Sequence, residues 1–180
     1  ILQDWDSSHR TGGMLLLLWL ISMVSLPITF WTMGDDAIPA GVNISAVIQA
    51  SAVLLLLKAD WGWRRTLYTL GLVAVVTWGA EFVGSSTGFP FGEYSYTERL
   101  QPQIGHVPLL IPFAWFMMLP PAWAIAQAIT RPKRHSLRHK LAFIGISAVA
   151  LTAWDLFLDP QMVGWGFWEW AHPVGYFGIP

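Results

Sequence analysis

Five long apolar stretches, separated by short charged segments, most constrain what this chain can fold into. Each stretch carries at most one charged side chain. About 20 apolar residues in a helix cross the hydrocarbon core of a bilayer, so each stretch is long enough to span. Lipid offers the backbone no hydrogen bonds, which leaves helices as the expected structure. The sequence predicts an all-α, polytopic transmembrane helical bundle, a single domain over residues 1–180. Its spans are expected near residues 12–33, 38–57, 66–84, 107–129 and 141–158.

Composition excludes several other classes. Of the 180 residues 54% are hydrophobic and 12% charged, which is too apolar for a disordered chain. The absence of cysteine excludes a disulfide scaffold, a zinc–thiolate site and an iron–sulfur centre. A net charge of −1 argues against a nucleic-acid partner, because phosphate binding needs a basic surface. Tryptophan is unusually abundant: its 12 copies exceed the 10 of Lys and Arg together.

The two ends of the sequence suggest part of a longer protein. The chain starts at Ile1 and stops at Pro180 within an aromatic, Gly-rich segment. The first stretch is too long for a cleaved signal peptide, and acids precede it, so we interpret it as a true span.

Basic residues fall almost entirely on one side of the predicted topology. With five spans, that side includes the N-terminus, and only Arg99 lies on the other. The positive-inside rule therefore predicts a cytoplasmic N-terminus in the inner membrane, and a basic loop near lipid headgroups. The nine basic residues are Arg10, Lys58, Arg64, Arg65, Arg131, Lys133, Arg134, Arg138 and Lys140.

Acids within the spans are the candidate functional residues. A carboxylate in hydrocarbon costs about 2.5–3.5 kcal/mol on insertion scales, so it usually faces the protein interior and has a task. Glu81 lies near the end of the third predicted span, and Asp155 and Asp159 share one helical face in the fifth, where Pro160 is expected to end the helix. All three are expected toward the non-cytoplasmic face. The alternative is a structural carboxylate bonded to a loop or to Arg99.

Aromatic segments flank these acids. Residues 84–108 are rich in Gly, Pro and Ser, which predicts a structured loop. Residues 164–178 repeat this aromatic character, which predicts an interfacial or re-entrant segment on the same side. Prolines in the fourth span predict a kink that opens space between helices. A plain aromatic belt is the alternative for these loops, and Trp115 in the fourth span is expected to be a belt, packing or interface residue.

Carboxyl groups, aromatic faces and apolar surroundings suit proton addition to an alkene. A carboxylic acid in an apolar site keeps its proton, and aromatic faces attract a cation without attacking it. A second carboxylate could orient water onto that cation. Pigment-, sterol- and quinone-binding proteins use similar surroundings without chemistry.

At these residues the sequence resembles a known family. The segment WGAEFVGSSTGFPFGEYSYT, the span VPLLIPFAWFMM, and then AWDLFLDPQMV and GFWEW resemble the integral-membrane carotenoid hydratases, annotated broadly as carotenoid biosynthesis proteins. The resemblance covers residues from about Trp78 to Pro180. It implies addition of water across the terminal C1–C2 double bond of an acyclic or monocyclic carotenoid, with no redox cofactor. No metal site is predicted.

Roles for individual residues come from the chemistry. Asp155 or Glu81 is expected to protonate C2, and Asp159 to orient the water that attacks C1. His106 is a candidate proton relay, although a loop histidine is more often simply solvated. The candidate substrate-binding residues are Trp78, Phe89, Phe91, Glu93, Tyr94, Tyr96, Trp154, Trp168 and Glu169.

Two rival functions remain, and a transporter is not expected. A carotenoid-binding or assembly subunit would use the same aromatic cleft without proton chemistry. A prenyltransferase would need paired acidic motifs for magnesium and diphosphate, and the sequence has no DxxxD or DDxxD motif. A transporter would need charged residues deep in several spans, and they are missing from this sequence.

Overall fold

The computed structural model describes residues 2–130 and 136–179. Helices account for most of it, which confirms the predicted all-α class: α1 (Leu2–Met33), α2 (Ile38–Thr87), α3 (Leu110–Thr130) and α4 (Leu137–Gly164). A short 3-10 helix, η1 (Asp35–Ala37), connects α1 to α2. The strands are β1 (Tyr94–Tyr96), β2 (Gln103–Ile104), β3 (Val107–Pro108) and β4 (Trp168–Trp170).

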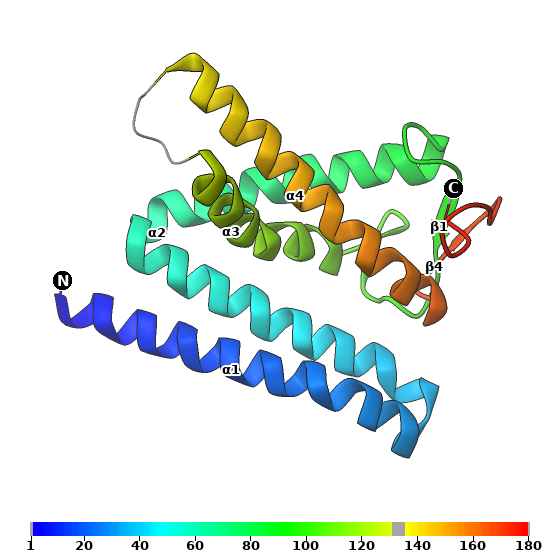
Figure 1. Cartoon of the computed structure of the whole chain (residues 1–180). Helices are drawn as coiled ribbons and strands as arrows, with labels where there is room; N and C mark the ends of the chain where they lie inside the picture. The colour runs from blue at the N-terminus through cyan, green and yellow to red at the C-terminus, as the bar shows by residue number, and fades with distance from the viewer. Residues whose placement is uncertain (1, 131–135, 180) are drawn as a thin grey trace.

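Helix α2 contains two of the predicted spans, 38–57 and 66–84, and breaks between them. Gly62 has φ 76° and ψ 161°, a backbone conformation accessible essentially only to glycine. Figure 1 shows that the chain reverses direction at this break, so that both halves of α2 extend to the same side of it. Four helices of the described residues are long and apolar enough to cross a membrane, counting α2 once. Five crossings stay a prediction.

The helices pack in sequence order: α1 on α2, α2 on α3, and α3 on α4. Close approach of α1 and α2 depends on small residues, as in many membrane helix pairs. A Cβ atom at Gly41 would lie 2.6 Å from Cδ2 of Leu26, so a larger residue there would force the Leu26 side chain to shift. Ser22 and Ser45 share a hydrogen bond of 2.8 Å across the same interface.

The outward faces of the helices are apolar. Large side chains such as Val24 on α1, Val75 on α2 and Val149 on α4 are about 70% exposed. Soluble monomers rarely expose apolar surface on this scale, whereas lipid solvates it well. The protein is therefore an integral membrane protein.

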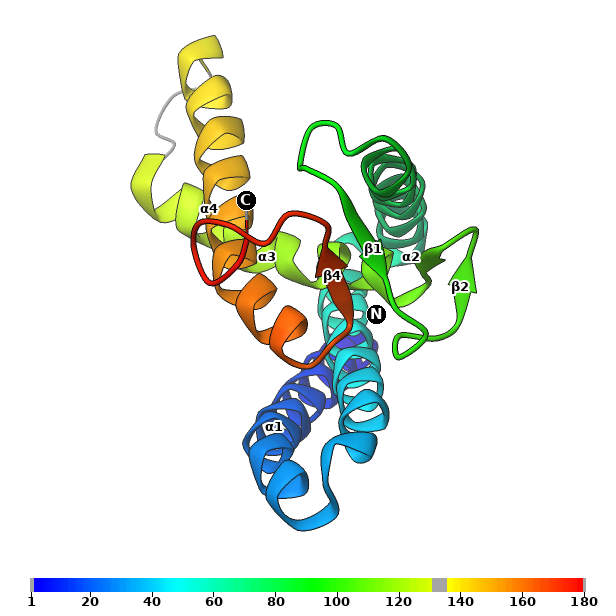
Figure 2. The same cartoon turned by 90° about the vertical axis from the view of Figure 1, so that its right-hand side faces the viewer.

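One end of the bundle carries the loops predicted to be structured. Strands β1 and β4 pair antiparallel, with Tyr94 opposite Trp170 and Tyr96 opposite Trp168, and they lie side by side in Figure 2. The two aromatic segments thus lie on the same side, as predicted. A cluster that includes Leu26, Ile38, Leu100 and Phe167 packs this end onto the helices.

Two details of the predicted helices are wrong. Pro160 does not end its helix, because α4 continues to Gly164. Proline removes one hydrogen-bond donor and introduces a local clash, and a helix tolerates both near its end. The fourth span begins at Leu110, not at 107, since Val107 and Pro108 pair with β2.

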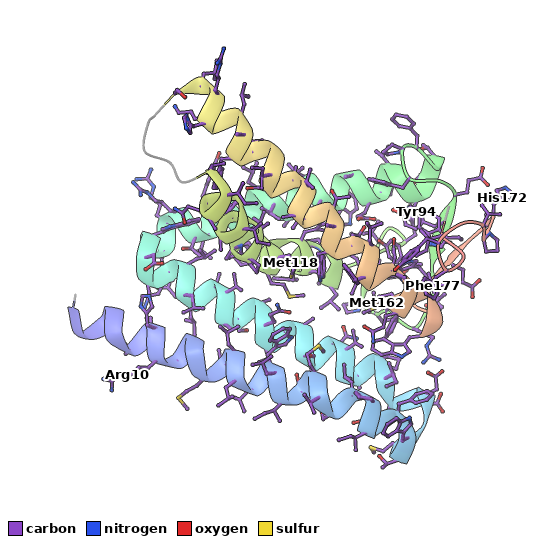
Figure 3. The ribbon with its side chains drawn as sticks, in the orientation of Figure 1. Arg10, Tyr94, Met118, Met162, His172 and Phe177 are labelled. Atoms are coloured by element: carbon purple, nitrogen blue, oxygen red, sulfur yellow. The ribbon has the colours of Figure 1, made fainter. Side chains whose placement is uncertain are left out.

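The two ends of the bundle carry different charged side chains. Arg10 lies at the opposite end from Tyr94 and His172 (Figure 3). Arg99 forms an ion pair of 2.8 Å with Asp35 rather than with any of the three candidate acids. The predicted basic residues Arg131, Lys133 and Arg134 lie outside the described residues.

Candidate active site

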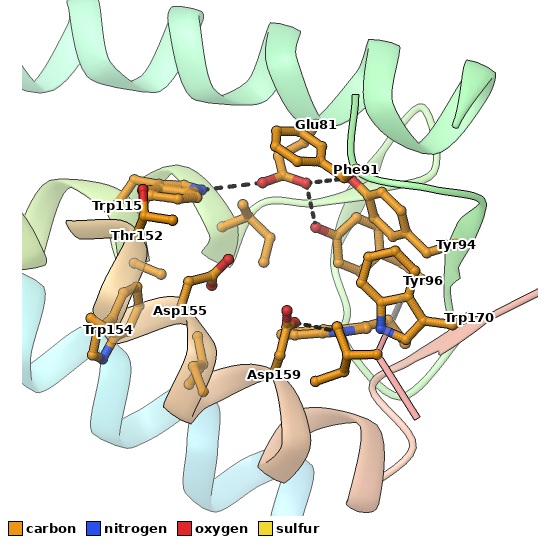
Figure 4. A pocket seen from close by; sticks show the side chains of 15 residues that line it. Glu81, Phe91, Tyr94, Tyr96, Trp115, Thr152, Trp154, Asp155, Asp159 and Trp170 are labelled. Carbon is orange, nitrogen blue, oxygen red and sulfur yellow. Dashed lines mark hydrogen bonds between the residues drawn. The ribbon is translucent and has the colours of Figure 1, made fainter. Parts of the chain in front are cut away.

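A cavity of about 240 Å³ lies among α2, α3, α4 and the β1–β4 pair. It brings together the three acids predicted from the sequence, Glu81, Asp155 and Asp159 (Figure 4). Much of the remaining wall is aromatic, which makes the surroundings of these acids largely apolar. The lining residues are Glu81, Phe91, Tyr94, Tyr96, Ile111, Ala114, Trp115, Thr152, Trp154, Asp155, Leu158, Asp159, Trp168, Trp170 and Ile179.

Glu81 accepts three hydrogen bonds from the cavity wall. The hydroxyl groups of Tyr94 and Tyr96 donate to Oε2 at 2.6 and 2.8 Å. The indole Nε1 of Trp115 donates to Oε1 at 3.2 Å. Both carboxylate oxygens therefore act as acceptors, and the side chain is held in one position.

The two tyrosines are fixed as neutral donors. Burial, followed by the nearby charge of Glu81, raises the pKa of Tyr94 and of Tyr96 well above the ordinary value of 10.0. Their rings meet edge to face, with centroids 5.6 Å apart. Because β4 pairs with β1, Trp170 packs on Tyr94 and Trp168 on Tyr96.

Asp155 and Asp159 lie one turn apart on α4 and both face the cavity. Asp159 accepts a hydrogen bond of 3.0 Å from Nε1 of Trp168. Asp155 has no hydrogen bond to any of the residues that the structure describes. Of the three acids, Asp155 is thus the one whose oxygens are not committed to a protein donor.

Other candidate residues lie away from the cavity wall. Trp78 donates to the carbonyl of Ile104 and stacks on Phe82. His106 also stacks on Phe82, with ring centroids 4.7 Å apart, and shares a hydrogen bond with the hydroxyl of Ser86.

Three more candidates are solvent-facing in this part of the chain. Phe89 is 75% exposed. Glu93 lies 3.8 Å from His172, and both side chains are mostly exposed. Glu169 is exposed in the middle of β4, where alternation turns it away from Trp168 and Trp170.

Trp115 is the main residue that the sequence interpretation assigned wrongly. It was placed among the tryptophans explained by belt, packing or interface roles, yet it bonds to Glu81 and meets Trp154 edge to face at 6.4 Å. Thr152 was also absent from the candidate site. No spacing in the sequence relates Trp115 on α3 to Glu81 on α2. Thr152, by contrast, lies three residues before Asp155, and this spacing could have indicated that the two share a helical face.

Among the described residues, no three His, Asp or Glu side chains are grouped closely enough to hold a metal ion. The geometry offers three carboxyl groups, ordered hydrogen-bond donors and aromatic faces. Together with the apolar helices, it defines a polytopic membrane protein with an acidic, aromatic cavity at one end of the bundle.

Comparison with known proteins identifies the family. Residues 41–180 match the family model described as carotenoid biosynthesis protein, so the chain belongs to this family and the resemblance seen in the sequence is confirmed. The chain is 31% identical over 118 residues to the bisanhydrobacterioruberin hydratase of Haloarcula japonica, a match that covers 65% of this chain and 39% of that protein. No solved structure matches the chain.

Proposed function

We propose that this protein hydrates the terminal C1–C2 double bond of an acyclic or monocyclic carotenoid end group without a cofactor. The observation that carries the proposal is the cavity in which an uncommitted carboxyl, Asp155, faces Glu81 and Asp159 among aromatic side chains. The relative named as a hydratase supports the reaction class.

Asp155 is the proposed proton donor. Its proton adds to C2, the double-bond electrons form the new C–H bond, and the positive charge develops on the tertiary carbon C1. An apolar wall keeps a carboxyl protonated until an acceptor arrives. The residue has no hydrogen bond with the described residues that would have to break first.

Aromatic faces and Glu81 stabilise the cation. The rings of Trp115, Trp154 and Trp168 line the same cavity, and indole faces attract cations. The charge of Glu81 adds a favourable electrostatic term. Its three donors hold both oxygens, which keeps this carboxylate from adding to the cation itself.

Asp159 is proposed to orient the water. The bond from Trp168 fixes one of its oxygens, and the other can accept a proton from water as the water oxygen attacks C1. The proton that water releases to Asp159 balances the one that Asp155 gave to C2. Proton exchange with solvent then returns Asp155 to its protonated form and Asp159, one turn away, to its deprotonated form.

The site is proposed to lie toward the non-cytoplasmic face of the inner membrane. The tyrosine- and tryptophan-rich strands at this end suit a lipid–water interface, and water is available there. The opposite end carries the described basic residues other than Arg99, which suits contact with anionic lipid headgroups.

The experiment is expression of the chain in cells that accumulate lycopene, followed by mass analysis of the pigments. We expect a product heavier by one water molecule, and none from Asp155→Asn. The exposed loop acid changed in Asp36→Asn serves as the matched control and should leave the product unchanged. Pigment that copurifies with the wild type yet returns unaltered would instead identify a carotenoid-binding subunit.

A further inference from the structure

A second, larger cavity runs between the α1–α2 pair and the α3–α4 pair. Its volume is about 840 Å³. Met118 and Met162 project into this space in Figure 3. No lining residue among the described ones is charged, and the polar ones are the neutral Ser45, Gln49 and Gln161.

This apolar groove adjoins the candidate active site. Trp154 and Leu158 line both cavities. Along α3 the two linings follow in order: Ala114 and Trp115 face the active-site cavity, and from Met117 to Ala124 the helix faces the groove. The groove thus shares part of its wall on α4 with the active-site cavity, and along α3 it continues beyond that cavity.

The dimensions suit an elongated ligand. On α2 the groove residues extend from Val42 to Leu56, which at 1.5 Å per residue is about 21 Å. On α4 they extend from Trp154 to Trp165, about 16 Å. A rod-shaped molecule lying here would run roughly along the helices, within the thickness of a bilayer core.

We propose that the groove binds the conjugated chain of the carotenoid whose end group reacts in the cavity. This inference rests on the proposed function for the nature of the ligand. An uncharged rigid polyene needs a long neutral channel, and the methionines Met23, Met117, Met118 and Met162 provide adaptable packing along it. The groove then fixes which atoms reach Asp155, so substrate length and stiffness determine specificity.

Ala124 offers a direct test. It lines the groove nine residues beyond Trp115, about 14 Å along α3, so it lies far from the acids. Its side chain is exposed, so Ala124→Trp fills the groove without overpacking the core. Ala128→Trp is the matched control: that alanine lies one turn further on, is also exposed, and does not line the groove.

The variants are compared in lipid nanodiscs with two probes. One is lycopene, whose binding induces visible circular dichroism when a chiral site holds the polyene. The other is a short acyclic terpene with the same end group. We expect Ala124→Trp to weaken lycopene binding about tenfold, with Ala124→Leu intermediate. Turnover of the short probe should be unchanged, and Ala128→Trp should match the wild type with both.

Failure of this inference is separable from failure of the proposed function. If lycopene is hydrated but Ala124→Trp and Ala128→Trp behave alike, the groove is occupied by lipid or by another part of the protein, and the inference is wrong. Equal loss for both probes would likewise contradict it. If lycopene binds with the expected dependence on Ala124 and neither probe is hydrated, the groove stands and the hydratase proposal falls.

Discussion

Replacing Asp155 by Asn should slow turnover by orders of magnitude while leaving the protein as stable as before. Asn has the shape of Asp but no proton to give to C2. The side chain has no hydrogen bond with the described residues, so its replacement breaks none of them. A general acid contributes about 100- to 10,000-fold to a rate, which is about 3–5 kcal/mol of barrier. We expect kcat to fall by this factor.

The assay is hydration of lycopene by purified variants, with thermal unfolding measured on the same samples. Asp36→Asn, in the exposed loop before α2, is the control for loss of a carboxylate and should retain full activity. An Asp155→Asn protein that is folded and turns over at the wild-type rate would refute the assignment of the proton donor. An unfolding temperature that drops with the activity would indicate a structural role instead.

Three further outcomes follow from the structure. Glu81→Gln should lower stability as well as activity, because the amide nitrogen that replaces one oxygen cannot accept a hydrogen bond from Tyr94 or Trp115. Each hydrogen bond to a charged group contributes about 1.5–3 kcal/mol. Unchanged thermal unfolding would contradict this prediction. The pKa of Tyr94 and of Tyr96 is raised in the folded protein, so their contribution to stability is complete below about pH 10. At higher pH the unfolded chain loses protons that the folded chain keeps, and the stability should therefore fall. The double Tyr→Phe variant should lose this pH dependence in alkaline unfolding curves, and a variant that keeps it would show that other groups cause it. The chain has no native cysteine, so Glu98→Cys and Lys140→Cys should react with an impermeant thiol reagent from opposite sides of the membrane; labelling of both from one side would refute the five-span topology.

Much of the fold follows from the spacing of charges. Apolar stretches interrupted by short charged segments predicted the helices, and Gly- and Pro-rich composition predicted the structured loop. The charged segment between the second and third spans predicted that the chain turns there. Nothing in the local sequence shows whether it turns through a loop of several residues or at a single glycine, as it does at Gly62. Helix α4 passes Pro160 since its next turn still packs against the loop end of the bundle.

The site was predictable where residues share an element. Asp155 and Asp159 lie one turn apart, so the helix period alone places them on one face. Trp115 could not be found in this way, because its bond to Glu81 depends on how α3 crosses α2. Trp78 shows the converse: it shares a helical face with Glu81, yet its indole turns to the carbonyl of Ile104.

The origin of the product's oxygen tests the hydratase proposal most directly. Purified protein is incubated with lycopene, without air, in water enriched in heavy oxygen and deuterium, and the product is analysed by mass spectrometry. We expect the hydroxyl on C1 to carry the heavy oxygen of water, and C2 to carry one deuterium. A hydroxyl that forms only in air and takes its oxygen from O₂, or a pigment recovered unchanged, would contradict acid-catalysed hydration by this site.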